Sequence, residues 1–568
     1  MRGQDGKPAS ADLIVLGSGA AGLAAAVTAS YHGLKVLVVE KEDRFGGASA
    51  ISGGTIWIPG NRHAVGAKLD ASLTAARTYL GKMIGNGIDQ KLVDTFLARG
   101  EEALAFLEEN SELKFKVRLV SPDYHMEVEG ASNGGRALEV LEYDGSRLGK
   151  RFGELRKPPQ GMLLFGGMMV NRVDIQHFLN ARRSWASLSH CLKLLVRYAG
   201  DRLRHDRGTR LVVGNALVAR LARSAFDLGA DLRLGMKTKA LIEERGEIRG
   251  IVVDTPSGEQ KIRARAGVIS ATGGFGASSE AGRWRPGTGS SHRSMSPAGN
   301  VGDGMMLAAS AGAVLGEDLV SNFYWAPVSV LTHEDGREER FPHLVTDRAK
   351  PGLIAVNRLG RRFVNEADSY HRFVLAMLAD PQANSPCHLI CDSRALATYG
   401  LGLARPSPAS NAALVRRGYL LKADSIDALA RKIGVDPQAL RETIQRYNAE
   451  AARGADPDFG KGSSSYNRSM GDAAHRPNPC LAPVAQAPFY AVKLVSGDLG
   501  SALGIRIDEH ARALDATGRA IPGLYAVGND MNSIMNGTYP GPGITLGPAL
   551  TFGYIAALDA VDRMKQLR

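Results

Sequence analysis

Cysteine is scarce in this chain of 568 residues. Only Cys191, Cys387, Cys391 and Cys480 are present, and no two of them have C-x-x-C spacing. So few scattered cysteines exclude a disulfide scaffold and predict a reducing compartment. Cys387 and Cys391 flank His388 in the stretch CHLICD, which we interpret as a buried strand rather than a metal site. We therefore expect no metal.

Long apolar runs are also missing. No segment reaches about 18 uninterrupted apolar residues, the length that a membrane-spanning helix needs. The N-terminal stretch MRGQDGKPASADLIVLGSG has no apolar core ahead of a small-residue cleavage site. We expect a cytoplasmic protein that does not span a membrane.

A nucleic-acid signature is absent as well, although the formal net charge is +12. The basic residues are spread along the chain and match no DNA- or RNA-binding motif, so we expect no nucleic-acid partner. Hydrophobic residues make up 44% and charged residues 23% of the chain, as in ordinary folded proteins. The length predicts more than one domain.

The first positive signal is a glycine pattern near the N-terminus. An apolar strand over 12–16 leads into Gly17, Gly19 and Gly22, and an Ala-rich helix and a second strand over 35–39 follow, ending in Glu40. In this context the glycines allow a tight turn, a pyrophosphate approach and close helix packing, while the acid accepts hydrogen bonds from a ribose. The helix N-terminus favours the phosphates. The pattern predicts a dinucleotide site and leaves flavin and nicotinamide open.

Four further stretches resemble the fumarate reductase and succinate dehydrogenase flavoprotein superfamily. They are EKEDRFGGASAISGGTIWIPGN after the second strand, VISATGGFG at 268–276, GNVGDGMMLAASAGA from Gly299 and GLYAVGND at 523–530. The resemblance spans nearly the whole chain and implies FAD. Covalent members carry a histidine six residues before the second glycine pair, where this chain has Gly47 before Gly53, so non-covalent FAD is expected. The implied cofactor-binding residues are Gly17, Gly19, Ala20, Ala21, Gly22, Glu40, Lys41, Gly47, Ala48, Ser49, Ser52, Gly53, Gly54, Ala271, Thr272, Gly273, Gly274, Asp303, Gly528, Asn529, Asp530, Gly543, Ile544 and Leu546.

The same resemblance predicts an α/β fold with a discontinuous Rossmann-like FAD-binding domain and an inserted α+β substrate (cap) domain. We place the FAD-binding domain at 1–305 and 491–568 and the substrate domain at 306–490. Alternating apolar residues over 238–253 predict a β-hairpin. In GLYAVGND, either Asn529 or Asp530 is expected to reach the ribityl chain of FAD.

Residues 150–210 look like an insertion. Within 180–207, Trp185, Leu188, Leu192 and Leu195 recur at helical spacing among basic residues, which are Arg182, Arg183, Lys193, Arg197, Arg202 and Arg204. Such a helix can lie on an anionic membrane surface as a peripheral contact. The alternative is that its apolar stripe packs on the rest of the protein or on a sister subunit.

Two tyrosines stand where relatives in the superfamily have arginines. In NEADSY, Tyr370 takes the place of the proton-donating arginine of fumarate reductases, and in GTYPGPG, Tyr539 takes the place of the arginine that grips a carboxylate. An arginine pair suits a dicarboxylate, whereas tyrosines suit a neutral, apolar ketone. These stretches, SGDLGSALGIRID and Tyr124 in SPDY resemble the 3-oxosteroid 1-dehydrogenases.

That resemblance implies a reaction and roles. Tyr539 and the backbone N–H of Gly543 would hold the ketone oxygen, where negative charge develops. Tyr370, helped by Tyr124, would remove the neighbouring proton as general base, and a hydride would pass to flavin N5. A small steroid-like ketone and an external electron acceptor are the implied partners. The unperturbed tyrosine pKa of about 10 is far above neutrality, so the base would need a local field.

Other interpretations remain open at this point. The enzyme could be a 4,5-desaturating ketosteroid dehydrogenase or a soluble enoate reductase of the fumarate type. His371 and Arg372, beside Tyr370, keep an anionic substrate under consideration. A flavin-binding subunit whose tyrosines line a plugged pocket is the non-enzymatic alternative. Oligomeric state does not follow from the sequence.

Overall fold

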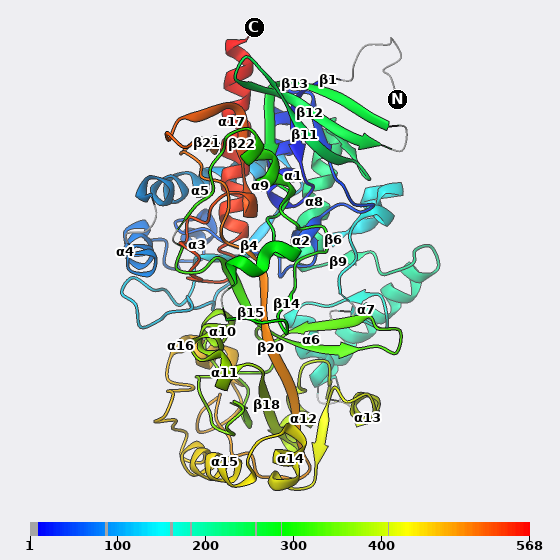
Figure 1. Cartoon of the computed structure of the whole chain (residues 1–568). Helices are drawn as coiled ribbons and strands as arrows, with labels where there is room; N and C mark the ends of the chain where they lie inside the picture. The colour runs from blue at the N-terminus through cyan, green and yellow to red at the C-terminus, as the bar shows by residue number, and fades with distance from the viewer. Residues whose placement is uncertain are drawn as a thin grey trace.

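The computed structural model describes residues 10–567 apart from 86–88, 160–162, 182–183, 256–257, 286, 318 and 407. The molecule is elongated, with an upper part that holds both chain ends and a lower part built from the middle of the chain (Figure 1). Each part has its own large sheet, and strand β20 (Phe489–Ser501) runs from the middle of the molecule into the lower part.

The upper sheet has the order β10-β2-β1-β13-β12-β11, with β22 and β21 added beside β13. Its strands are β1 (Ser10–Leu16), β2 (Val36–Val39), β10 (Asp231–Arg233), β11 (Lys237–Glu244), β12 (Glu247–Thr255), β13 (Gly258–Ser270), β21 (Arg512–Leu514) and β22 (Ala520–Ala526). The core strands β10, β2, β1, β13 and β22 are parallel. The expected hairpin at 238–253 is confirmed as β11 and β12.

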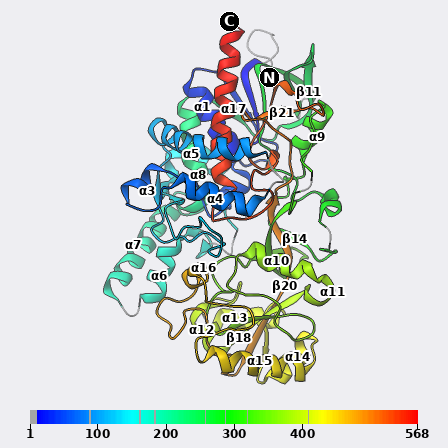
Figure 2. The ribbon, with the colours of Figure 1, turned by 90° about the vertical axis from the view of Figure 1, so that its left-hand side faces the viewer.

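Helices pack closely against this sheet and each other because the side chains on their contact faces are small. Helix α1 (Ala20–Tyr31) is buried from its first residue to Ser30 and packs against α17 (Leu546–Gln566) and α8 (Val213–Asp227). Alanines and glycines on α1 allow the helices to approach closely. Helix α5 (Gln90–Asn110) also packs against α17 and runs across it in Figure 2.

The lower sheet has the order β16-β15-β20-β18-β17, with β14 and β19 also pairing with β20. Its strands are β14 (Arg293–Ser294), β15 (Phe323–Thr332), β16 (Glu338–Pro342), β17 (Leu353–Val356), β18 (Cys387–Asp392), β19 (Leu421–Ala423) and β20. The stretch CHLICD is confirmed as a strand, β18, which is buried except for the half-buried His388. Helices α10 (Tyr370–Ala379), α14 (Ile426–Ile433), α15 (Pro437–Ala451) and α16 (Ser465–Met470) surround the sheet.

The remaining described strands form three small sheets. One contains β3 (Thr55–Trp57), β5 (Ala137–Val140) and β4 (Phe115–Val117). In the other two, β6 (Tyr143–Asp144) pairs with β9 (Arg210–Leu211), and β7 (Leu163–Leu164) pairs with β8 (Met168–Met169). The other helices that contribute residues to the site are α2 (Gly47–Ala50), α4 (Leu73–Ile84) and α9 (Asp303–Ser310).

The upper sheet combines segments from before residue 271 with segments from after residue 511. The division at 305 and 490 stays a prediction.

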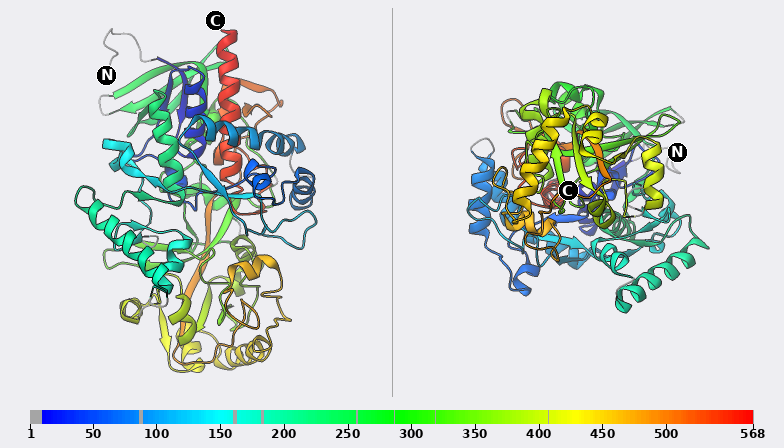
Figure 3. Two further views of the ribbon diagram at one scale, coloured as in Figure 1. Left: turned by 180° about the vertical axis from the view of Figure 1, so that it is seen from behind. Right: turned by 90° about the horizontal axis from the view of Figure 1, so that it is seen from below.

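The expected helix in the insertion is present. Helices α6 (Arg172–Asn180) and α7 (Trp185–Arg202) pack on each other and lie at the edge of the molecule, as seen from behind and from below (Figure 3). Of the predicted stripe, Trp185 is 86% exposed and Leu192 52% exposed. Arg182 and Arg183 lie outside the described residues. Among the described residues, no helix combines the length and apolar character needed to cross a membrane.

Candidate active site

The turn from β1 into α1 requires glycine at two places. Gly17 has a φ of +101°, and a Cβ there would lie 2.3 Å from the carbonyl oxygen of Ala271. A Cβ on Gly22 would lie 2.2 Å from the carbonyl oxygen of Gly17. Gly19, by contrast, has an ordinary φ of −72° at the N-cap of α1. Its Cβ would come no closer than 3.4 Å to protein, at Ser49 Oγ, so the close approach it permits is toward space outside the chain.

Glu40, at the end of β2, is buried and hydrogen-bonded. Ser18 donates from its Oγ at 2.6 Å and from its backbone N–H at 3.2 Å, both to Oε2. Burial raises the pKa of the Glu40 carboxyl, and the hydrogen bonds from Ser18 oppose that rise. Close by in sequence, Lys41 forms an ion pair with Asp303 at the start of α9. Two predicted positions 262 residues apart thus meet.

The loop 46–54 folds back on the start of α1. Ser49 Oγ accepts the N–H of Ala20 at 3.0 Å, and Ser52 Oγ donates to the carbonyl of Ser49 at 2.7 Å. A Cβ on Gly54 would lie 2.4 Å from the backbone of Val213. The expected cofactor-binding residues of the first strand–helix turn and those of this loop therefore lie next to each other.

The buried carboxylate of Asp530 links its own segment to the turn that follows β13. Its carboxylate accepts from Ser270 Oγ at 2.5 Å, from Thr272 N–H and Oγ1 at 2.7 and 2.9 Å, and from Gly274 N–H at 2.8 Å. The carboxylate is fully buried and occupied by these four donors. The sequence left Asn529 and Asp530 as alternatives, and of the two it is Asn529 that lines the adjacent pocket.

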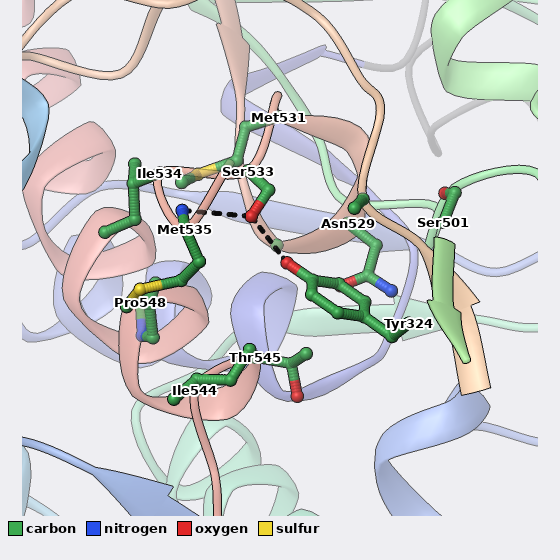
Figure 4. A pocket seen from close by; sticks show the side chains of 12 residues that line it. Tyr324, Ser501, Asn529, Met531, Ser533, Ile534, Met535, Ile544, Thr545 and Pro548 are labelled. Atoms are coloured by element: carbon green, nitrogen blue, oxygen red, sulfur yellow. Dashed lines mark hydrogen bonds between the residues drawn. The ribbon is translucent and has the colours of Figure 1, made fainter. Parts of the chain in front are cut away.

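That pocket lies between the end of β20, the 528–535 segment and the start of α17 (Figure 4). Tyr324 on β15 projects toward it and donates to Ser533 Oγ at 2.6 Å. The lining residues are Tyr324, Ser501, Ala502, Gly528, Asn529, Met531, Ser533, Ile534, Met535, Ile544, Thr545 and Pro548. The predicted Gly528, Asn529 and Ile544 are among them, and Leu546 begins α17 next to it.

These residues fit a flavin dinucleotide. The Gly17 turn and the N-terminus of α1 provide the approach for a pyrophosphate, and Gly273 and Gly274 adopt φ of +92° and +77° beside it. The residues around Asn529 add an amide and hydroxyls among apolar side chains, which are groups that the polar edges of a flavin would need. In the described chain, no group of three or more His, Cys, Asp or Glu side chains is placed to hold a metal ion.

The three predicted tyrosines converge near this pocket, whose Tyr324 has its ring centroid 5.5 Å from that of Tyr539. The ring centroids of Tyr124 and Tyr539 are 5.5 Å apart and stacked, and those of Tyr370 and Tyr539 are 5.0 Å apart and perpendicular. Tyr124 Oη donates to Tyr370 Oη at 3.1 Å. Each of the three side chains is less than 10% exposed. Residues 124, 370 and 539 are thus brought into one buried cluster, which we call the tyrosine cluster.

Burial keeps these phenols protonated at neutral pH. It raises the pKa of Tyr124 and Tyr370 well above the ordinary value, and that of Tyr539 to about 12. The hydrogen bond to Tyr370 lowers the Tyr539 pKa in part. The local field that a resting tyrosinate would require is therefore missing from the described residues around the cluster.

Gly543 closes the loop beside Tyr539. Its φ is +98°, and a Cβ would lie 2.6 Å from the backbone of Thr55 and Ile56. Its carbonyl accepts the N–H of Trp57 at 3.2 Å and that of Gly547 at 2.9 Å. Within the described residues its own N–H has no hydrogen-bond partner, so it remains available as a donor.

The structure adds residues that the sequence analysis did not single out. The ring of Tyr466 on α16 lies 4.8 Å from Tyr124, and Tyr324 lies 5.5 Å from Tyr539. His371 is buried 5.9 Å from Tyr539, with Nδ1 accepting the N–H of Trp325 at 3.2 Å. Tyr324 and Tyr466 sit in stretches without a distinctive pattern, so only the folded chain reveals them.

Comparison with known proteins agrees with this geometry. The family model described as FAD binding domain matches residues 12–546. The chain is 37% identical to the 4-oxocyclohex-2-ene-1-carboxylate 5-dehydrogenase of Sinomonas cyclohexanicum, covering 99% of this chain and 95% of that one. It is 35% identical to the 3-oxosteroid 1-dehydrogenase of Mycolicibacterium smegmatis, covering 96% of each. The chain belongs to the FAD-dependent 3-oxosteroid 1-dehydrogenase family.

A solved structure shows the same fold. The 3-ketosteroid Δ1-dehydrogenase of Sterolibacterium denitrificans, in complex with 1,4-androstadiene-3,17-dione, has a TM-score of 0.89 and 33% identity, covering 97% of this chain and 99% of that one. The predicted α/β class and the FAD cofactor are confirmed for this family member, as is its assignment to the flavin oxidoreductases that act on CH–CH groups. The roles of single site residues stay predictions.

Proposed function

We propose that this family member introduces a C=C bond next to the carbonyl of a cyclic ketone, either a 3-ketosteroid or a smaller oxo ring. One observation carries the proposal: Tyr124, Tyr370 and Tyr539 form a single buried cluster, and the N–H of Gly543, four residues after Tyr539, has no partner among the described residues. Phenol and peptide donors can hold a ketone oxygen, and a buried, largely apolar surround suits a carbon ring.

In this proposal each group acts at a stated atom. Tyr539 Oη and Gly543 N–H donate to the ketone oxygen, where negative charge develops as the neighbouring C–H loses its proton. Tyr370 in its deprotonated form takes that proton at Oη, and Tyr124 Oη, 3.1 Å away, stabilises the deprotonated form by donating a hydrogen bond to it. Exclusion of water from the cluster strengthens the bonds to the oxygen.

FAD, held non-covalently, would supply the two-electron oxidation that removal of the hydride requires, with an external electron acceptor to complete the turnover. The turn at Gly17, Gly19 and Gly22 would hold the pyrophosphate, with Asn529 toward the ribityl chain. Asp530 would fix the surrounding turns instead of touching the cofactor, because its carboxylate is occupied by Ser270, Thr272 and Gly274.

Substrate class is tested with a panel of ketones. The FAD-loaded protein is assayed with a dye acceptor on 4-androstene-3,17-dione, 4-oxocyclohex-2-ene-1-carboxylate and cyclohexanone, and the new double bond is located by NMR. We expect reduction of the dye and a bond adjacent to the carbonyl. Dye reduction by none of the ketones, or flavin reoxidation by fumarate instead, would contradict the proposal.

The pH dependence of kcat/KM tests whether Tyr370 is the general base. Because burial raises the pKa of Tyr370 well above 10, its deprotonated fraction grows about tenfold per pH unit below that pKa. We expect kcat/KM to keep rising from pH 7 to pH 10 without a plateau near neutrality. Tyr370→Phe should lower the rate by orders of magnitude and flatten this slope. A plateau below pH 8 in the native enzyme would assign the base elsewhere.

An anionic dicarboxylate fits the site less well. Arg372, the nearest arginine in sequence, is 41% exposed and turned to Glu127 at 2.7 Å and Asp368 at 3.6 Å. Its charge is therefore already balanced outside the tyrosine cluster. His371 is neutral, since burial lowers its pKa to about 3.

We also propose a cytoplasmic location with peripheral membrane contact through α7. Trp185, Leu192, Val196 and Leu203 are all more than half exposed, and they fall on one side of the helix. Lys193, Arg197, Arg202 and Arg204 stand beside them, and Lys193, Arg202 and Arg204 are exposed. Apolar side chains flanked by cations suit the headgroup region of an anionic bilayer. Of the stripe predicted from the sequence, Leu188 and Leu195 are half-buried, so the side of α7 that is open to solvent is the one that carries Trp185 and Leu192.

The membrane contact is tested by sedimentation with phosphatidylglycerol vesicles. Trp185→Glu combined with Leu203→Glu should reduce the bound fraction at least fivefold, because charges replace the apolar contact. Leu119→Glu, at an exposed position outside α7, serves as the control and should bind as the native protein does. Equal binding of all three proteins would contradict the proposed membrane contact through α7.

A further inference from the structure

A second cavity opens in the lower part of the molecule, away from the tyrosine cluster. Its volume is about 440 Å³, within the range of small-molecule sites. It is lined by Arg358, Pro386, His388, Gly418, Tyr419, Leu421, Lys432, Ile433, Gly434 and Lys493. None of these residues carries a carboxylate, and four of them are basic.

The cavity follows from the path of β20. On one side, β20 pairs with β19 as far as Ala491 and begins to pair with β15 at Val495. Lys493 lies in the gap between these partners, and on its other side it faces His388 of β18. The end of α14, from Lys432 to Gly434, forms the opposite wall. A change of strand partner thus leaves an opening that the sheet cannot fill.

The cations around the opening have no acidic partners. Across the described chain, neither Arg358, Lys432 nor Lys493 forms an ion pair, and Lys432 Nζ donates only to the carbonyl of Lys422, at 2.6 Å. This contrasts with Arg362, which binds both Glu366 and Asp456 at 2.8 Å. The positive charge at the cavity is therefore not neutralised by an ion pair among the described residues.

His388, which faces Lys493, does not add to this charge. Burial lowers its pKa to about 4, and the neighbouring charge of Lys493 adds to the lowering, so the ring is neutral at pH 7. The last turn of α14 also carries Arg431 and Lys432, which offset the partial negative charge of the helix end.

We propose that this cavity binds a phosphate ester: Arg358, Lys432 and Lys493 hold the phosphate, and Pro386, Leu421 and Ile433 contact the organic part. Two lysines and an arginine match the charge and the several acceptor oxygens of a phosphate or pyrophosphate. The apolar lining distinguishes the site from a plain basic surface. It is separate from the FAD site, because none of its lining residues borders the glycine turn or the pocket at Asn529.

The test uses the FAD-loaded enzyme and ADP as the probe, by isothermal titration at low ionic strength. We expect one ADP per chain beyond the bound FAD, with affinity falling as salt rises. Lys432→Gln combined with Lys493→Gln should weaken binding at least tenfold and leave the dye-reduction rate unchanged. Lys91→Gln, at an exposed position on α5, is the matched control and should bind as the native enzyme does.

A second arm separates a soluble ligand from a lipid headgroup. Vesicles containing phosphatidic acid are sedimented with the same three proteins. Vesicle binding that the double variant loses, without ADP binding, assigns the phosphate to a lipid. ADP binding that the double variant retains in full, or no binding of either probe by the native enzyme, would overturn the proposal.

Discussion

Replacing Tyr539 by phenylalanine should lower kcat about 10²- to 10³-fold on an accepted ketone, the loss expected when one donor to a developing oxyanion is removed. The ring is retained, so its contacts with Tyr124, Tyr370 and Tyr324 persist. Only the hydroxyl that is proposed to hold the ketone oxygen is lost. Steady-state dye reduction gives kcat and KM, and we expect the change to fall mainly on kcat.

Tyr466→Phe is the matched control. Tyr466 belongs to the same buried aromatic group and lies 4.8 Å from Tyr124, yet its hydroxyl is buried without a hydrogen-bond partner among the described residues. Removing that hydroxyl should change kcat less than threefold. If both variants lose activity equally, the loss reflects packing of the aromatic group. If Tyr539→Phe keeps full activity, its assigned role is wrong.

Gly19→Val should produce a folded protein without flavin. The backbone at Gly19 has an ordinary φ, and the nearest protein atom to a Cβ is 3.4 Å away, so the chain itself tolerates a side chain. A side chain there would instead fill the space that the pyrophosphate must approach. Steric overlap of this kind costs about 2 kcal/mol or more, or ~30-fold in FAD affinity. Absorbance of the purified protein and titration of the apoprotein with FAD measure the change.

Gly81→Val controls for the substitution itself. Gly81 lies on α4 with open space around its Cβ position, far in sequence from the glycine turn. This variant should stay yellow and bind FAD as the native protein does. Circular dichroism of both variants shows whether they fold. A Gly19→Val protein that retains full flavin occupancy would place the pyrophosphate elsewhere.

The nucleotide turn could be predicted because it is local. Strand, glycines, helix and acid lie within residues 12–40, and the structure shows why Gly17 and Gly22 permit no side chain. The strand CHLICD was predicted for the same reason. Each depends on a pattern that one contiguous segment contains.

The tyrosine cluster depends on distant contacts. Tyr124 and Tyr370, 246 residues apart in the chain, were placed together through resemblance, and the hydrogen bond between them is visible only in the folded chain. The same limit hid Tyr324 and Tyr466. It also left Asn529 and Asp530 undecided, because the four donors that occupy Asp530 come from residues 256 to 260 positions earlier.

Exposure of α7 was equally out of reach. An amphipathic pattern gives the stripe but not what covers it, and only the folded chain shows Leu192 half exposed. The pattern of β20 likewise gives no hint that the strand changes partners near Lys493. Openings of this kind depend on which strands pair in the folded sheet, and no single segment of the sequence encodes that pairing.

The exposure of Trp185 also gives the protein an intrinsic optical reporter. Of the four indoles in the chain, Trp57 and Trp325 are buried and Trp284 is half-buried, whereas Trp185 is surrounded by solvent. A bound isoalloxazine absorbs at the wavelengths where indoles emit, so the interior tryptophans should be dimmed by energy transfer. The long-wavelength emission should therefore come mostly from Trp185, and a blue shift of that emission would follow events at α7 without any added label.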